Sequence, residues 1–294
     1  MMTHGNWRWV ILACSLATWG AAFARSGDAP NLNAPSLDPP SLNAPSLWDP
    51  NRHTARPDLP GFRAIRFLTE DDYPPLNFRK PDGDLAGFNV DVARAVCEQL
   101  VVGCTIQARR FDTLVDSLLG GKGDAVIASI AATPSMRESV EFSAPYYRTP
   151  GRFVARADRP AFDPSADGLD GKKVAVIGQS AHETYMRLFF PKATIVSVPD
   201  FVTLASAVKD GSVDLGFADG LTLSVWLAGE DSAKCCAFQG GPYLDSKLFG
   251  EGVSVAMRKE DTTLRVAIDW ALARMAQNGA YAELLRKYFP VGFQ

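Results

Sequence analysis

Residues 171–190 read GKKVAVIGQSAHETYMRLFF, and this stretch decides the fold predicted for the chain. Lys173–Ile177 is a short Val- and Ile-rich run typical of a buried strand, and Ala181–Phe190 is predicted to be a helix. A first alternation of strands and helices already occupies residues 65–129, so residues 171–190 begin a second one. Two such runs predict two α/β lobes built on parallel sheets.

The elements predicted around this stretch keep the same alternation. An apolar face at helical spacing runs from Val90 to Leu100 and indicates a helix there. The other predicted strands are Ile65–Thr69, Asp124–Ser129, Thr194–Val198, Asp214–Ala218 and Val253–Arg258. The other predicted helices are Asp112–Leu119, Phe201–Asp210, Leu221–Leu227, Thr262–Gln277 and Ala280–Tyr288.

These elements set the predicted domain boundaries. Lobe 1 comprises residues 61–152 together with residues 256–294, and lobe 2 comprises residues 153–255 with the hinge segments. The chain is expected to cross between the lobes at Phe153–Arg156 and at Glu251–Val255. Ligands of open α/β sheets lie beyond the carboxyl ends of the strands, so the predicted site is a cleft between the lobes.

The composition is that of a globular protein. Of the 294 residues, 47% are hydrophobic and 21% are charged, which excludes a fully disordered or collagen-like chain. Thirty basic and thirty-three acidic residues give a net charge of −3. Lys and Arg form no long tract, so no nucleic-acid partner is predicted.

The first 24 residues have the pattern of a signal peptide. Arg8 precedes an apolar run from Trp9 to Ala24 that ends in a small-residue cleavage site. This run is shorter than the roughly 20 residues of a spanning helix, although an uncleaved anchor is the alternative. Lipidation at Cys14, in a poor match to a lipoprotein box, stays open. The pattern predicts a soluble mature protein outside the cytoplasm, and the resemblance described below implies the periplasm.

Residues 25–60 are rich in Pro, Asn, Ser and Asp, and Pro-Ser-Leu recurs there at Pro35, Pro40 and Pro45. Such a segment buries little apolar surface and lacks many N–H donors, so it is predicted to be a disordered linker. Its regularly spaced Leu residues could alternatively dock on a partner protein.

Four cysteines follow the signal peptide. Cys97 and Cys104 lie late in a predicted helix and at the start of a predicted strand, a spacing that suits a local disulfide in an oxidising compartment. Cys235 and Cys236 form either a redox-labile vicinal disulfide or two thiols. No His accompanies either pair at zinc-site spacing, so neither a metal site nor a cofactor is predicted.

Several motifs resemble the periplasmic solute-binding proteins that deliver polar amino acids, including lysine, arginine, ornithine and histidine, to ABC importers. The matching segments are Thr69–Pro75, Gly87–Ala93, Gly123–Val126, Phe142–Tyr147, Gly171–Val176, Gly240–Pro242, Lys247–Gly250 and Lys287–Phe289. The resemblance spans residues 61–291. It implies the type II periplasmic-binding-protein fold with two hinge crossings, a monomer, and an inner-membrane ABC permease as partner. It also places a disulfide at Cys97 and Cys104.

The resemblance implies roles for individual site residues. The family's acid for the ligand's α-ammonium corresponds to Asp219, and its acid for a basic side chain corresponds to Glu70. Tyr73 and Phe111 occupy the places of rings that sandwich the ligand, and Ser129 occupies the place of a hydroxyl or backbone contact.

The carboxylate side of the predicted site departs from the family pattern. The expected Arg, three residues after Thr133, is Met136. Ala131 and Ala181 stand where the family has hydroxyl side chains. Gln179 and His182 flank the second of these positions and complete the predicted ligand-binding set.

The loss of the guanidinium has an energetic consequence. An Arg holds a carboxylate with paired, charge-assisted hydrogen bonds, and losing it typically costs about 2–5 kcal/mol of binding. One interpretation is that the ligand is a cationic or polyhydroxy amine that lacks an α-carboxylate. The other is that Arg137, Arg110 or the helix N-terminus at Ala181 supplies substitute donors.

Each position also has an ordinary structural explanation. Glu70 could be a solvated acid, Asp219 a helix cap, His182 a first-turn surface residue, and Tyr73 and Phe111 core rings. At the level of the whole protein, the alternative is an accessory partner of a periplasmic dehydrogenase. A cyclohexadienyl-dehydratase-like enzyme is less favoured, because a dicarboxylate substrate needs cationic groups that this site lacks. The chain is therefore predicted to be a binding protein that closes about a hinge, and not an enzyme.

Overall fold

The computed structural model describes residues 55–293 apart from residues 61 and 164. The predicted signal peptide and nearly all of the predicted linker lie outside the described residues. Leu59, within the predicted linker, already packs against the hydrophobic core of lobe 1, so the packed chain begins slightly before residue 61. In the described part of the chain, none of the helices combines the length and the apolar character that a membrane crossing needs.

Lobe 1 is built on a mixed sheet with the strand order β5-β1-β6-β13-β7. Its strands are β1 (Ala64–Thr69), β5 (Gly103–Ala108), β6 (Ala125–Val126), β7 (Glu141–Phe142) and β13 (Ala256–Met257). β1 is parallel to β5 and β6, whereas β13 is antiparallel to β6 and β7. The predicted strands at residues 124–129 and 253–258 are therefore present but much shorter than expected.

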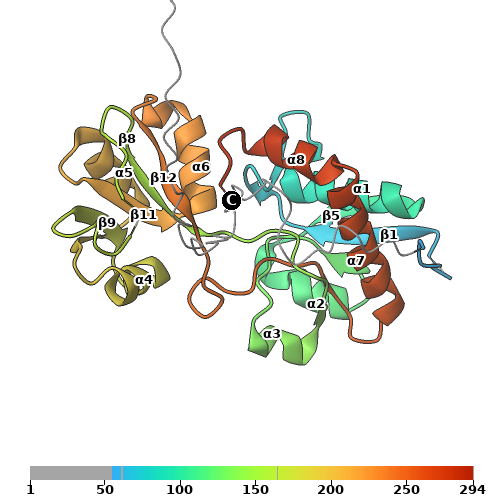
Figure 1. Cartoon of the computed structure of the whole chain (residues 1–294). Helices are drawn as coiled ribbons and strands as arrows, with labels where there is room; N and C mark the ends of the chain where they lie inside the picture. The colour runs from blue at the N-terminus through green and yellow to red at the C-terminus, as the bar shows by residue number, and fades with distance from the viewer. Residues whose placement is uncertain (1–54, 61, 164, 294) are drawn as a thin grey trace, which may run out of the picture. The chain divides into compact units, whose positions relative to one another are not determined.

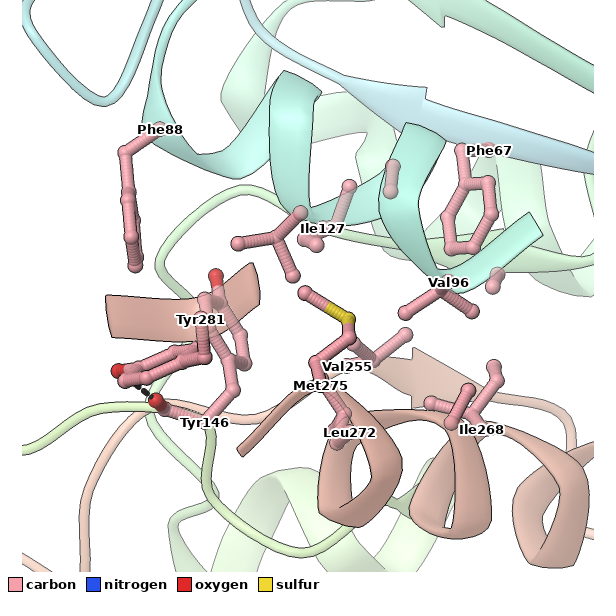
Figure 2. Packing of buried hydrophobic residues seen from close by; sticks show 14 of the residues in the cluster. Phe67, Phe88, Val96, Ile127, Tyr146, Val255, Ile268, Leu272, Met275 and Tyr281 are labelled. Atoms are coloured by element: carbon pink, nitrogen blue, oxygen red, sulfur yellow. Dashed lines mark hydrogen bonds between the residues drawn. The ribbon is translucent and has the colours of Figure 1, made fainter. Parts of the chain in front are cut away.

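Helices cover both faces of this sheet. They are α1 (Phe88–Leu100), α2 (Leu114–Leu119), α3 (Pro134–Ser139), α7 (Thr262–Gln277) and α8 (Ala280–Tyr288). α1, α7 and α8 pack on one face (Figure 1), where Phe67 of β1, Val96 of α1 and Met275 of α7 meet in one core (Figure 2). α2 and Met136 of α3 pack on the opposite face, against Leu68.

Two smaller elements of lobe 1 lie beside the predicted site. A three-stranded sheet contains β2 (Asp72–Tyr73), β3 (Asn77–Arg79) and β4 (Leu85–Ala86), all antiparallel. A single 3₁₀ turn, η1 (Phe111–Thr113), follows β5 and leads into α2. Both elements follow the carboxyl end of a parallel strand, which is where the topology places a ligand.

Lobe 2 repeats the same plan with the strand order β10-β9-β11-β8-β12. Its strands are β8 (Gly151–Arg156), β9 (Lys173–Ile177), β10 (Thr194–Val198), β11 (Leu215–Asp219) and β12 (Cys236–Tyr243). Its helices are α4 (Ala181–Phe189), α5 (Phe201–Asp210) and α6 (Gly220–Ala228), followed by the 3₁₀ turn η2 (Glu230–Ser232). α4 packs on one face of the sheet, and α5 and α6 pack on the other.

The predicted hinge crossing at Phe153–Arg156 is wrong. These residues belong to β8, which pairs with β11 on one side and with β12 on the other. Phe153 and Val154 are fully buried on opposite faces of the sheet, so this segment is part of the core of lobe 2. The connections between the sheets are residues 143–150 and 244–255, and Tyr147 and Val253 form a bridge between them.

The two cysteine pairs have unequal states in the structure. Cys97 and Cys104 are free, so the expected disulfide between them is not formed. Each thiol acts on the other, which raises the pKa of Cys97 and lowers the pKa of Cys104. The Cys104 thiol also lies 3.6 Å from the carbonyl oxygen of Ala93. Cys235 and Cys236 form a vicinal disulfide where β12 begins.

Candidate functional site

The loop after β1 contains a mostly buried acid with polar and acidic neighbours. Glu70 directly follows the buried end of β1 and is only 9% exposed. Burial raises the pKa of its carboxyl above the ordinary value, the nearby Asn77 side chain opposes this increase, and the negative charge of Asp72 adds to it. A partly buried carboxylate of this kind favours a cationic partner.

Behind this loop lies a buried polar network that the sequence analysis did not identify. The Asn89 amide nitrogen donates to Asn77 Oδ1 at 2.6 Å and to Ser129 Oγ at 2.9 Å. The Tyr146 hydroxyl donates to Asn89 Oδ1 at 2.7 Å. Because each partner is itself held by the lobe 1 core, the network fixes Ser129 beyond the carboxyl end of β6. Ser129 adopts a left-handed backbone with φ of 59°.

Two aromatic side chains on lobe 1 are unusually exposed. Tyr73 in β2 is 49% exposed, and Phe111 at the start of η1 is 54% exposed. The alternative that they are ordinary core rings is therefore wrong. Burial raises the pKa of Tyr73, and the negative charges of Asp219 and Glu70 raise it further, which places Tyr73 near both acids. Tyr73, an uncovered ring near two acids, can stack on the stem of a cationic ligand.

Asp219 occupies the junction between β11 and α6 in lobe 2. Its Oδ1 accepts hydrogen bonds from the backbone N–H of Thr222 at 2.8 Å and from Thr222 Oγ1 at 2.9 Å, so Asp219 does cap α6. The cap uses only one carboxylate oxygen. The charge of Asp219 raises the pKa of Tyr147 of lobe 1, in addition to the larger effect of burial. Asp219 can therefore serve as a helix cap and still present a negative charge toward lobe 1.

The start of α4 is held by a dense set of hydrogen bonds. Ser180 caps the helix by accepting from the N–H of Glu183 at 3.1 Å. Glu183 in turn accepts from the Gln179 N–H at 2.7 Å and also binds Ser197 and Arg187. These hydrogen bonds lower the pKa of Glu183 to about 2, and the bond from Ser197 contributes most. Gln179 is exposed with φ of 60°, and the following Ala181 is half-buried.

His182 lies in an aromatic setting on α4 and is not the surface residue that the alternative proposed. Its ring stacks on Phe249 at 4.8 Å between centroids and packs edge-on against Phe217 at 5.7 Å. Its Nε2 is buried and has no hydrogen-bond partner among the described residues. Burial lowers the pKa of His182, while the negative charge of Asp219 opposes this decrease.

The carboxylate side contains no unpaired guanidinium at the expected positions. Met136 of α3 is partly buried and packs against the apolar core of lobe 1. Arg137 binds Glu251 Oε2 at 3.1 Å and lies over the Phe142 ring at 5.4 Å. Arg110 is highly exposed and pairs with Asp112 at 2.5 Å. Both proposed substitutes for the family's Arg therefore already have a carboxylate partner.

Some of the predicted ligand-binding residues interact with one another in the structure, and others do not. Electrostatic effects link Glu70 and Tyr73 of lobe 1 with Asp219 and His182 of lobe 2, and hydrogen bonds hold Ser129 beneath them. The predicted residues without such a link to the others are Phe111, Ala131, Met136, Gln179 and Ala181. Ala131 is exposed and pairs with Val253. The described residues contain no group of three or more side chains suited to hold a metal ion.

Asn77, Asn89 and Tyr147 are the functional candidates that sequence reasoning missed. Asn89 belongs to the Gly87–Ala93 motif. It lies on the buried face of α1, where helical periodicity predicts an apolar side chain. A polar residue in an otherwise apolar stripe is the signal that could have found the network, because buried amides need partners.

Comparisons with known proteins identify the family. The sequence model of the bacterial extracellular solute-binding proteins, family 3, matches residues 65–291. The chain is 37% identical over 237 residues to an L-arginine-binding protein of Pseudomonas aeruginosa, covering 79% of this chain and 91% of the relative. It is 31% identical to the lysine/arginine/ornithine-binding periplasmic protein of Escherichia coli, covering 77% of this chain and 87% of the relative.

Solved structures show the same fold. The second substrate-binding domain of GlnP from Lactococcus lactis matches with a TM-score of 0.68 at 19% identity, over 80% of this chain and 99% of that domain. An ancestral cationic amino acid solute-binding protein matches with a TM-score of 0.58 at 25% identity, over 77% of this chain and 95% of that chain. The predicted type II periplasmic-binding-protein fold is thereby confirmed.

Proposed function

Because this chain belongs to the bacterial extracellular solute-binding proteins, family 3, we propose that it is the periplasmic receptor of an ABC importer for a small, cationic, amine-containing solute. The observation that carries the proposal is the pair of acids, Glu70 and Asp219, whose charges both act on Tyr73. Two carboxylates on opposite lobes bind a ligand with two positive groups better than any neutral or acidic solute.

The relatives support a basic ligand, and Met136 restricts which one. The names of two relatives state that they bind arginine, lysine or ornithine. At the position where the resemblance implies the family's carboxylate-binding Arg, this chain has Met136, whose partly buried side chain packs against the core. The solute is therefore a basic amino acid held with a weakened carboxylate contact, or the corresponding amine without the carboxylate.

Capture proceeds by hinge closure about residues 143–150 and 244–255. A ligand that contacts Glu70 and Tyr73 on lobe 1 and Asp219 on lobe 2 stabilises the closed arrangement, because only that arrangement makes both sets of contacts. The closed form is then recognised by the permease. No chemical step is required of the protein.

Replacing Asp219 by Asn tests the proposal. Asn also caps helices, so α6 should persist while the negative charge is lost. We expect the affinity for a basic amino acid or its amine to fall by at least about tenfold, measured by titration calorimetry, because a charge-assisted bond to the ammonium is removed. Asp200→Asn is the matched control, since Asp200 caps α5 in the same way, through the N–H of Thr203.

The control should bind like the wild type. If both variants bind equally well, Asp219 is not the ligand's anchor. If the wild type binds neutral amino acids as tightly as it binds cations, the assignment of a cationic solute is wrong.

A further inference from the structure

The loss of the guanidinium at Met136 leaves open what meets a ligand's carboxylate, and lobe 2 offers an answer. His182 carries a polar atom, Nε2, that is buried without a partner in the described part of the chain. A buried polar atom without a partner is costly, so its retention points to a partner that arrives with the ligand. His182 also lies close enough to Asp219 for the two charges to interact.

The surroundings of His182 fix its position. The ring is stacked on Phe249 of the 244–255 connection and packs edge-on against Phe217 of β11. Phe217 precedes Asp219 by two residues on the same strand, so both side chains project from the same face of the sheet. Asp219 and His182 can therefore contact adjacent atoms of one ligand, such as the ammonium and the carboxylate of an α-amino acid.

On the basis of the proposed function, we propose that His182 is a pH-sensitive specificity determinant of the site. In its neutral form it leaves the charge of Asp219 available to an amine. In its protonated form it offers a cationic donor to a ligand carboxylate, in place of the guanidinium that is missing at Met136, and it competes with an amine for Asp219.

On α4 and the elements packed around it, the other carboxylates are already hydrogen-bonded or paired, and the tyrosines stay neutral near pH 7. Glu183 on the same helix is engaged by Arg187, Ser197 and the Gln179 N–H. Tyr185 of α4 and Tyr243 of β12 pack in the same aromatic cluster, and burial raises the pKa of both above the ordinary range. In the 244–255 connection, Asp245 Oδ1 accepts hydrogen bonds from the backbone N–H groups of Lys247 and Leu248. Lys247 and Glu251 are the remaining charges of that connection, and Glu251 pairs with Arg137.

Comparing arginine with its decarboxylated form, agmatine, isolates the contact between His182 and the ligand's carboxylate. Both carry a guanidinium and an ammonium, so the titration of Glu70 or Asp219 changes their binding alike, whereas only arginine has a carboxylate. We expect the ratio of the agmatine Kd to the arginine Kd to rise about fivefold or more between about pH 8 and pH 5.5, measured calorimetrically on the full mature chain.

Two variants keep the test decisive. His182→Gln removes the charge and keeps hydrogen-bonding capacity, and His182→Phe keeps the ring stacked on Phe249. Both should make the Kd ratio independent of pH. In the ligand-free protein, Asp219→Asn should lower the His182 pKa followed by NMR, whereas the control Asp200→Asn should leave it unchanged.

The outcomes separate the two proposals. If both compounds bind the wild type and the Kd ratio does not change with pH, the role of His182 is overturned while the proposed function stands. The same conclusion follows if the Kd ratio still changes with pH in both His182 variants. An unmoved His182 pKa in Asp219→Asn also overturns it. If neither compound binds at either pH, the proposed function is wrong and this inference falls with it.

Discussion

At the scale of single residues, Met136 is the residue on which the proposed choice of ligand most depends. Its side chain packs on the face of the lobe 1 sheet that α2 covers, beside Leu68 and Leu114. The neighbouring Arg137 does not compensate, since its guanidinium pairs with Glu251 of the 244–255 connection. An arginine introduced at position 136 would restore a cation where the family has one.

We expect Met136→Arg to increase the affinity for arginine by about tenfold relative to agmatine, because the new guanidinium can hold only the ligand that has a carboxylate. The measurement is titration calorimetry with both compounds. Ser135→Arg adds the same charge to an exposed position of α3 and serves as the control. An equal gain for both compounds would show that the carboxylate contact is not what limits arginine binding.

Residue types at the site could be predicted from the sequence, but their contacts could not. Glu70, Tyr73 and Asp219 were identified from the resemblance and are linked electrostatically in the structure. Whether Asp219 caps its helix or faces a ligand depends on which oxygen each partner uses, and the cap takes only Oδ1. The environment of His182 depends on Phe249, which lies 67 positions further along the chain, so no local pattern indicates it.

At the scale of elements, the N-terminus of α4 shows how one acid organises a loop. Glu183 accepts hydrogen bonds from three groups, among them the Gln179 N–H. The pKa of Glu183 is about 2, below its ordinary value of 4.5. A lowered pKa in the folded state means that the stabilisation is complete above the ordinary value and is lost as the pH falls toward 2.

We therefore expect Glu183→Gln to lower the free energy of unfolding at about pH 7, and the difference from wild type to shrink by about pH 3, where the unfolded-state carboxyl is protonated. Urea unfolding at both pH values measures it. Glu138→Gln, at an exposed position of α3, is the control and should show no such dependence. A difference that stays constant down to pH 3 would mean that the charge of Glu183 does not stabilise α4.

Helices were predictable where their apolar spacing is long and their ends are marked. The predicted ranges Phe201–Asp210, Thr262–Gln277 and Ala280–Tyr288 are those of the structure. β8 was mistaken for a hinge because a strand buried on both faces has no polar alternation that would distinguish it from a connection. The six-residue α3 is too short to show a helical period.

At the scale of the whole molecule, the protein consists of two sheets with matching strand orders, joined by two connections. The resemblance predicted this plan over residues 61–291, and the family match covers residues 65–291. The sequence could not define the connections themselves, because the bridge between Tyr147 and Val253 joins residues far apart in the chain, and no local pattern indicates it.

The most direct test of the central claim is a calorimetric titration of the mature protein with a panel of solutes. The panel comprises arginine, lysine, histidine, their decarboxylated amines, glutamate, a neutral amino acid and prephenate. The account predicts saturable one-to-one binding of at least one basic amino acid or amine and none of glutamate or prephenate, because Glu70 and Asp219 repel anions. Binding of glutamate or prephenate, or no binding of any cation, would contradict it.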